Sequence, residues 1–200
     1  MAPGNQNIYR KFILLMISAV FLSLTVPAQA KENMPSLSIF IESVKDGNPN
    51  MVRGVYVQGV MAYPIVQQPT GHPGYVSKES RVLTQFNMAA EAGNVGLLAH
   101  NYLAGENFTQ LVKGQEVNLI YGDGRVESFT VTDILRYQAL DPDSPTSDFR
   151  ELDDQVTIIT ASELFHLVYR GDRHVTFQTC IEANGNSSWG RLFIIAEPQK

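Results

Sequence analysis

The run Glu116-Val-Asn-Leu-Ile-Tyr-Gly-Asp-Gly-Arg-Val-Glu-Ser-Phe-Thr-Val-Thr-Asp-Ile134 decides the fold class of this chain. Both halves are rich in β-branched and aromatic residues, which favour strands. The Asp-Gly pair between them is a strong hairpin signal, because glycine supplies the positive φ that a tight turn needs. The run therefore predicts two antiparallel strands, Glu116–Tyr121 and Arg125–Ile134.

Similar short runs lie on both sides of this hairpin, each bounded by glycine, asparagine, aspartate or proline. We interpret them as strands near Ser36–Glu42, Val52–Val60, Arg81–Gln85, Val95–His100, Gln155–Thr160, Arg173–Cys180 and Arg191–Ala196. Close spacing of many short strands is typical of barrels, so the sequence predicts an all-β fold with a closed or nearly closed β-barrel.

Helices and long loops are expected to be minor parts of this fold. Thr160 followed by Ala161–Tyr169 predicts a capped helix of about two turns, and Glu106–Val112 predicts another short helix. The stretch Ala139–Asp148 contains two prolines and three aspartates, so it should be a surface loop. The ten residues Ile181–Gly190 are expected to form a turn-rich loop before the next strand begins.

The first thirty residues have the features of an export signal. Two basic residues precede the apolar run Phe12–Val26, and Pro27-Ala-Gln-Ala30 provides the small residues that signal peptidases cut. An uncleaved membrane anchor is the alternative, but about 15 apolar residues fall short of the 18 or more expected of a spanning helix. We expect residues 1–30 to be a signal peptide and residues 31–200 to be one exported domain. That domain would lie on the extracellular or cell-envelope side, either released after cleavage or anchored by its N-terminal segment.

Removal of the leader leaves an acidic protein. The leader contains two of the 15 basic residues and none of the 20 acidic ones, so the remaining net charge is about −7. Phosphate binding needs a basic face, and this charge therefore argues against nucleic acid as a partner.

Cys180 is the single cysteine of the chain and ends the strand-like run Val175-Thr-Phe-Gln-Thr-Cys180. One cysteine cannot close an internal disulfide, so this thiol is either an inert core residue or a reagent. Residues alternate between the two faces of a strand, which puts Cys180 on the polar face and Val175 and Phe177 on the other. In an antiparallel hairpin Arg191 would come close to Cys180, where a guanidinium stabilises a thiolate or a developing oxyanion.

A catalytic cysteine also needs a proton acceptor and donor, which is normally a histidine. His174 lies six residues before Cys180 on the same strand, roughly 20 Å away at about 3.3 Å per residue. His166 falls within a predicted helix and His72 within a Gly-His-Pro-Gly turn, and both have structural explanations. His100 ends an apolar strand and opens a polar segment, so a strand would deliver its imidazole to the mouth of a loop.

These residues and their surroundings resemble the sortase family. Thr176-Phe-Gln-Thr-Cys180 is similar to the sortase Thr-Leu-x-Thr-Cys signature, with Phe177 in place of the usual leucine, and Arg191–Ala196 is similar to the arginine-led strand that follows it. A further similarity lies earlier in the chain. Ala99-His100, followed by Phe108-Thr-Gln-Leu111 and Lys113-Gly114 and then by Glu116–Tyr121, is similar to the family's histidine segment, its short helix and its next strand. The resemblance covers about residues 82–196 and implies a sortase-like barrel of about eight strands with short helices.

Sortases are cysteine transpeptidases, and the resemblance implies a role for each candidate residue. Cys180 would attack the carbonyl after threonine in a Leu-Pro-x-Thr-Gly-like sorting signal and form a thioacyl enzyme. His100 would act as general acid and then as general base, and Arg191 would hold the substrate carbonyl or its oxyanion. The implied partners are proteins with C-terminal sorting signals and an amine acceptor, either a cell-wall peptide or a pilin lysine, or water.

This chemistry requires no cofactor. Some sortases use calcium to order a substrate loop, and the chain has a cluster of acidic residues in the corresponding region: Asp141, Asp143, Asp148, Glu151, Asp153 and Asp154. Their spacing fits no defined calcium loop, so a solvated loop is the favoured interpretation and a calcium site is the alternative.

Two other functions stay open at this point. One is a secreted cysteine peptidase or hydrolase built on the same three residues, in which water is the preferred acceptor. The other is a non-catalytic binding module of the cell envelope that keeps the barrel without turnover. In each case we expect a monomer.

Overall fold

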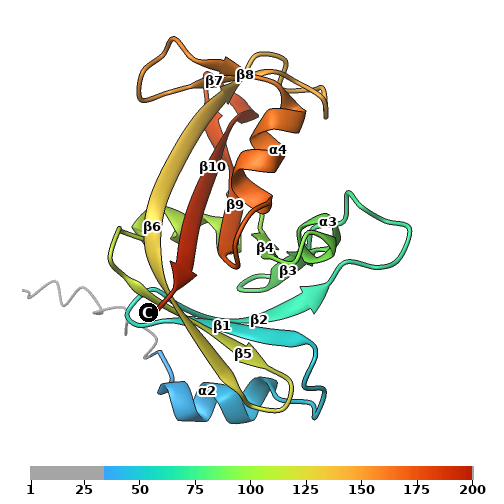
Figure 1. Ribbon diagram of the computed structural model, residues 1–200, viewed down its shortest axis with the longest axis vertical. Helices are drawn as coiled ribbons and strands as arrows, with labels where there is room; N and C mark the ends of the chain where they lie inside the picture. The colour runs from blue at the N-terminus through green and yellow to red at the C-terminus, as the bar shows by residue number, and fades with distance from the viewer. Residues whose placement is uncertain (1–33, 200) are drawn as a thin grey trace, which may run out of the picture. The chain divides into compact units, whose positions relative to one another are not determined.

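Eight strands pair edge to edge around a closed ring in the computed structural model, which describes residues 34–199 (Figure 1). The order around the ring is β10-β9-β4-β3-β2-β1-β5-β6, and β6 pairs with β10 to close it. The ring strands are β1 (Val52–Val57), β2 (Met61–Gln67), β3 (Leu83–Phe86), β4 (Val95–Leu98), β5 (Glu116–Tyr121), β6 (Val126–Ala139), β9 (Val175–Ala183) and β10 (Asn186–Pro198). The ring confirms the expected closed β-barrel, whereas the expected signal peptide, residues 1–30, lies outside the described residues.

Short helices and a small hairpin are added to this barrel. They are α2 (Leu37–Val44), α3 (Asn87–Glu91), the 3-10 helix η1 (Ala104–Gln110), α4 (Ala161–Tyr169), and the strands β7 (Phe149–Glu151) and β8 (Ile158–Ile159), which extend the sheet beyond β6. Helix α2 lies at the β1 and β5 end of the barrel, and α4 lies beside β9 and β10 (Figure 1). Among residues 34–199, no helix is both long enough and apolar enough to cross a membrane.

The barrel interior is filled by side chains that alternate along the strands. Val175 and Phe177 of β9 are completely buried within the main apolar core. Thr176, which lies between them, points the other way and donates a hydrogen bond to the carbonyl of Val168 in α4. Because alternation continues along the strand, Cys180 faces outward, away from the barrel core.

Helix α4 covers the outer face of β9 and β10, and the structure confirms its prediction from sequence. Thr160 and Glu163 form a capping box, in which each side chain accepts a hydrogen bond from the other residue's backbone N–H. Tyr169 packs edge-on against Phe193 of β10, with ring centroids 6.4 Å apart. Burial raises the pKa of the Tyr169 phenol, which donates to the side chain of Gln178. The helix is therefore fastened to β9 two residues before the cysteine.

The strand predicted over Ser36–Glu42 is wrong, because these residues form the beginning of α2. Ser36 caps the helix by accepting a hydrogen bond from the N–H of Ile39 at 3.4 Å. Leu37, Phe40, Ile41 and Val44 form one apolar face, which packs on Tyr56 and Ile120 of the barrel. Their spacing of three and four residues is the period of a helix, and alternation does not describe it.

Two further differences concern strands. The sequence does not predict β2, because Pro64 within it is typical of a break. Pro64 pairs with Gly54 of β1, one residue before pairing to β3 begins at Ile65, so the missing N–H falls where β2 pairs with β1 alone. The strand expected over Gln155–Thr160 is reduced to the two residues of β8.

A polar cluster joins the beginning of β9 to the β5–β6 hairpin across the end of the barrel. Arg173 donates to Glu127 at 2.9 Å, to the Tyr121 hydroxyl at 2.9 Å and to the Gly93 carbonyl at 3.1 Å. Tyr121 in turn donates to Glu127 at 2.6 Å. Burial on its own would raise the pKa of Glu127, but the hydrogen bonds from Arg173 and Tyr121 and the arginine charge together lower it.

Replacing Glu127 with glutamine should therefore change how stability depends on pH. A lowered pKa in the folded state stabilises the protein above the ordinary carboxyl value of 4.5, and this contribution is lost as pH falls through the folded-state value. At pH 7 we expect Glu127→Gln to lower the free energy of unfolding by about 1–2 kcal/mol. Urea denaturation between pH 3 and pH 7 measures this, and the variant should lose less stability on acidification than the parent.

The matched control is Glu42→Gln. It removes an ion pair of Glu42 with Lys45 on α2, in which both side chains are well exposed, so the stability curve should stay within about 0.5 kcal/mol of the parent's. If the free energy of unfolding of Glu127→Gln and of the parent changed with pH in the same way, Glu127 would not have a lowered pKa in the folded protein.

Candidate active site

Cys180 is half-buried on the outward face of β9, and its thiol is free. Its cross-strand partner in the antiparallel strand β10 is Arg191. Residues directly opposite each other in such a pair project to the same face of the sheet, so the thiol and the guanidinium share the outer face. The structure thus brings together two of the three predicted site residues.

The connection between these two residues differs from the expected loop over Ile181–Gly190. Strand β9 continues to Ala183 and β10 begins at Asn186, so the two strands form one hairpin. The turn is Asn184-Gly185, with φ of 53° and 75°, the positive values that two-residue hairpin turns require. A register shift between Asn186 and Gly190 interrupts the pairing after the turn, and regular pairing then runs from Gly190 opposite Ile181 to Ala196 opposite Val175, which includes Arg191 opposite Cys180.

His100 lies on the opposite side of β9 from Arg191, beyond the end of β4. Strand β4 pairs in parallel with β9 and places Leu98 opposite Gln178. His100 follows Leu98 by two residues, as Cys180 follows Gln178 by two. Arg191 and Cys180 are paired residues of β10 and β9, and His100 lies two residues beyond the last pair of β4 with β9, on the opposite side of β9 from Arg191.

Two neighbours of His100 complete this end of the site. The ring of Tyr102 stacks on that of His100, with centroids 5.2 Å apart and planes inclined by 20°. Asn101 donates from Nδ2 to the carbonyl of Ser187 at 3.3 Å, which links the residue after His100 to the β9–β10 hairpin. No sequence pattern predicts the Tyr102 contact, because it arises from the local turn that follows β4.

One nitrogen of the Arg191 guanidinium is hydrogen-bonded within the chain. Its Nη1 donates to the carbonyls of Ser188 and Gly190, both at 2.9 Å. The other guanidinium nitrogens make no hydrogen bond to any residue within 34–199. They are therefore available to an acceptor from outside the chain, and cationic N–H groups of this kind bind carbonyl oxygens and oxyanions well.

A cleft of about 540 Å³ opens beside His100. Its other wall is the segment between β2 and β3, which contributes Tyr75, Lys78 and Glu79 among its lining residues. His100 is half-buried and lines this cleft. The sequence contains no signal for this cleft, since residues 74–79 and His100 meet only through the fold.

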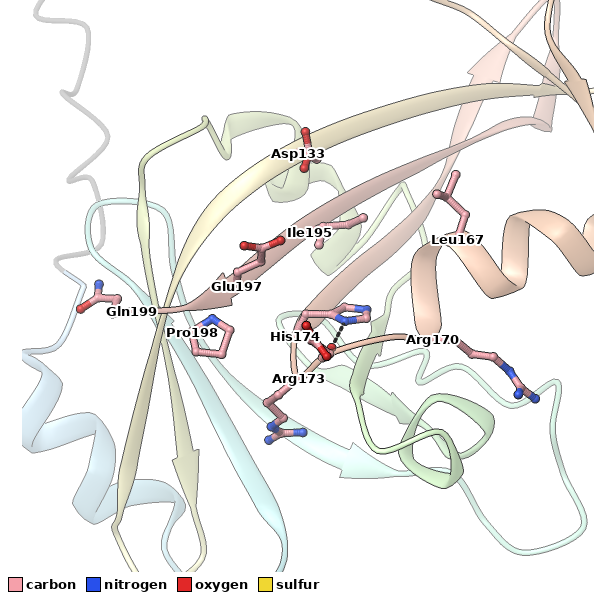
Figure 2. A pocket seen from close by; sticks show the side chains of 10 residues that line it. Asp133, Leu167, Arg170, Arg173, His174, Ile195, Glu197, Pro198 and Gln199 are labelled. Atoms are coloured by element: carbon pink, nitrogen blue, oxygen red, sulfur yellow. Dashed lines mark hydrogen bonds between the residues drawn. The ribbon is translucent and has the colours of Figure 1, made fainter.

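The other three histidines lie apart from Cys180. His174 lines a separate cleft of about 630 Å³ between the end of α4 and β10 (Figure 2). Its ring nitrogens lie 2.7 Å from the carbonyl oxygen of Asp172 and 3.0 Å from that of Val168, so they fasten the beginning of β9 to α4. The side chains of His72 and His166 are exposed, on a turn and on α4.

The acidic residues of the 141–154 region have structural contacts of their own. Asp153 forms an ion pair with Arg136, and Asp154 accepts hydrogen bonds from the N–H groups of Val156 and Thr157 at 2.9 and 3.0 Å. Within the described part of the chain, no group of three or more histidine, cysteine, aspartate or glutamate side chains is arranged to hold a metal ion.

Comparison with known proteins finds sortases among the solved structures. Sortase A of Listeria monocytogenes is 14% identical with a TM-score of 0.47, over 78% of this chain and 89% of that one. Sortase C of Clostridium perfringens is 13% identical with a TM-score of 0.46, over 82% and 83%. Sortase C-1 of Actinomyces oris is 13% identical with a TM-score of 0.49, over 86% and 85%.

No protein-family model matches the sequence, and no curated protein does. The likeness to the solved structures is distant in both sequence and structure, so the function has to be inferred from the residues of this chain.

Proposed function

We propose that this chain is an exported, sortase-type cysteine transpeptidase that acts on proteins carrying a C-terminal Leu-Pro-x-Thr-Gly-like sorting signal. The proposal is carried by the pairing of Cys180 with Arg191 across β9 and β10 and by the position of His100 two residues beyond the end of the next strand, β4. A thiol, an imidazole and a guanidinium are the nucleophile, the proton carrier and the oxyanion donor that acyl transfer needs. The reaction uses side chains of the protein alone and no cofactor.

In the first half-reaction, the Cys180 thiol gives its proton to His100 as the sulfur attacks the carbonyl carbon after threonine, and the N–H groups of Arg191 stabilise the charge that develops on the carbonyl oxygen. The C–N bond then breaks as His100 gives a proton to the departing amine. In the second half-reaction an incoming amine attacks the thioester, His100 takes a proton from that amine, and His100 passes this proton to the sulfur as the C–S bond breaks. The thiol is regenerated and a new amide is released.

The cleft beside His100 is the proposed route of the acceptor amine. It adjoins the imidazole that must take the amine's proton, and it is lined by the exposed side chain of Glu79. A carboxylate in this cleft would attract an ammonium group. Tyr75 also lines this cleft, and the positive charge of Lys78 offsets part of the attraction of Glu79 for an ammonium group.

Mass spectrometry of the protein incubated with a library of sorting-signal peptides tests the proposal. We expect a thioacyl adduct on Cys180 and, when an excess of amine is present, a ligated peptide product. Cleaved acid as the only product would favour the secreted hydrolase, since water would then be the preferred acceptor. If no peptide gave an adduct, the transpeptidase proposal would be wrong and a non-catalytic binding module would be favoured.

Replacing Arg191 with lysine should lower kcat/KM for the peptide by about 10²-fold, because removal of one oxyanion donor has effects of that size. Lysine keeps the charge but loses the planar fork, which here bonds two carbonyls and still presents free N–H groups. Arg125→Lys is the matched control: Arg125 is exposed and stacks on Tyr121 at the β5–β6 turn, away from the three site residues. Unchanged kcat/KM for Arg191→Lys would contradict the assigned role.

A further inference from the structure

The residue before His100 is bonded to β9 through both of its backbone polar groups. The N–H of Ala99 donates to the carbonyl of Gln178 at 3.2 Å, and the carbonyl of Ala99 accepts from Oγ1 of Thr179 at 2.9 Å. Gln178 and Thr179 immediately precede Cys180 in β9. The backbone leading into His100 is therefore fastened directly to the backbone leading into the cysteine.

His100 itself is hydrogen-bonded to η1 and to the residue before it. Its carbonyl accepts hydrogen bonds from the N–H groups of Leu103 and Gly105, both at 3.0 Å. Gly105 belongs to the first turn of η1 and is buried. The chain thus turns sharply after His100 and returns to bond the same residue, which fixes the base of the imidazole.

Gly105 leaves no room for a larger residue at this point. A methyl group on its Cα would lie 2.7 Å from the carbonyl oxygen of His100 and 3.0 Å from its carbonyl carbon, and would also overlap Oγ1 of Thr179. All three atoms belong to the bonds described above, and two of them are backbone atoms that cannot rotate away. A side chain here would therefore push η1 away from the end of β4, or push the end of β4 away from β9.

We propose that Gly105 and Thr179 are positioning residues that hold His100 beside Cys180. Neither needs to touch substrate for this role, because Thr179 acts through Ala99 and Gly105 acts through the carbonyl of His100. The inference rests on the proposed function only in that the His100 imidazole serves the Cys180 thiol.

The test is Gly105→Ala in the full chain. We expect kcat for peptide ligation to fall by about 10²-fold, as misplacement of a catalytic group by about 1 Å does, with little change in KM. A second measurement does not depend on turnover: NMR of the His100 imidazole before and after methylthiolation of Cys180. In the parent the modification should shift the His100 ring resonances, and in Gly105→Ala this shift should be much smaller.

Gly54→Ala is the matched control for loss of stability. A methyl group there would lie 2.8 Å from the Phe40 ring, between β1 and α2 on another part of the barrel. It should lower the melting temperature yet leave kcat and the NMR shift unchanged. If Gly54→Ala lowered kcat as much as Gly105→Ala, the effect would be general destabilisation, and the positioning role would be wrong.

Thr179 provides a second test that does not crowd the core. Thr179→Ser keeps the hydroxyl bond to Ala99 and should retain kcat, whereas Thr179→Val keeps the shape, loses the bond and should lower kcat and the NMR shift. Parent-like values for both Gly105→Ala and Thr179→Val would overturn the inference. If no peptide were turned over by the parent, the proposed function would fail, and the NMR comparison would still decide whether these residues hold His100 beside Cys180.

Discussion

Replacing Cys180 with alanine should abolish both the thioacyl adduct and peptide turnover. In the proposed reaction the sulfur forms the covalent intermediate, and loss of a nucleophile that works with a base and an oxyanion donor lowers kcat by several orders of magnitude. We expect a loss of about 10⁴-fold or more, measured as the initial rate of peptide ligation. Cys180→Ser should be nearly as inactive, because a hydroxyl is a weaker nucleophile than a thiol at neutral pH.

The fold should survive these substitutions. Cys180 is half-buried and faces away from the barrel core, so the free energy of unfolding should change by less than about 1 kcal/mol. Circular dichroism and thermal melting check this. Peptide ligation by Cys180→Ala at the parent's rate would show that the thiol is not the nucleophile.

Replacing His100 with alanine should lower the ligation rate by about 10²–10⁴-fold, the usual contribution of a general acid and base. The loss should depend on the leaving group. An amide nitrogen must be protonated as it departs, whereas an activated ester releases a stable anion without help. Acylation of His100→Ala by an ester analogue of the sorting peptide should therefore be much closer to the parent's rate than acylation by the amide.

His166→Ala is the matched control for this experiment, because His166 is exposed on α4 and lies apart from Cys180. It should keep the parent's rates with both substrates. An equal loss for amide and ester with His100→Ala would contradict the role of proton donor and would point instead to a role in binding or in shaping the site.

The elements that the sequence predicts well are those whose signals are local. The β5–β6 hairpin contains its own Asp123-Gly124 turn, and α4 contains its own capping box at Thr160 and Glu163. Each of these structures is fixed by residues within a few positions of one another. The bounds of β5 and α4 match the predicted ones, whereas β6 continues to Ala139, five residues beyond the predicted end at Ile134.

The wrong predictions for α2 and β2 have different physical causes. In α2 the apolar run is short, and Leu37 and Phe40 are as compatible with a strand by composition as with a helix by spacing. In β2 the proline is tolerated only because β3 has not yet joined the sheet at that position. That fact depends on where a distant strand begins, so the sequence of β2 alone cannot predict it.

The candidate site likewise has some features that local sequence predicts and others that depend on distant pairing. Cys180 and Arg191 belong to one hairpin, so strand alternation and antiparallel pairing predict their common face. The sequence favours His100 because it follows an apolar run, but its position beside Cys180 depends on a parallel pairing between residues 80 positions apart. The contacts of Tyr102, Gly105 and the 74–79 segment follow from that pairing, and no local pattern indicates them.

The turn at Asn184-Gly185 also bears on the order in which the barrel folds. A hairpin closed by a two-residue turn pairs early, because little chain entropy is lost in bringing its strands together. The parallel pairing of β4 with β9 joins distant segments and should form late. A nascent chain would then hold the thiol beside the guanidinium before the imidazole arrives. The three candidate residues would thus come together only when the last part of the sheet has closed.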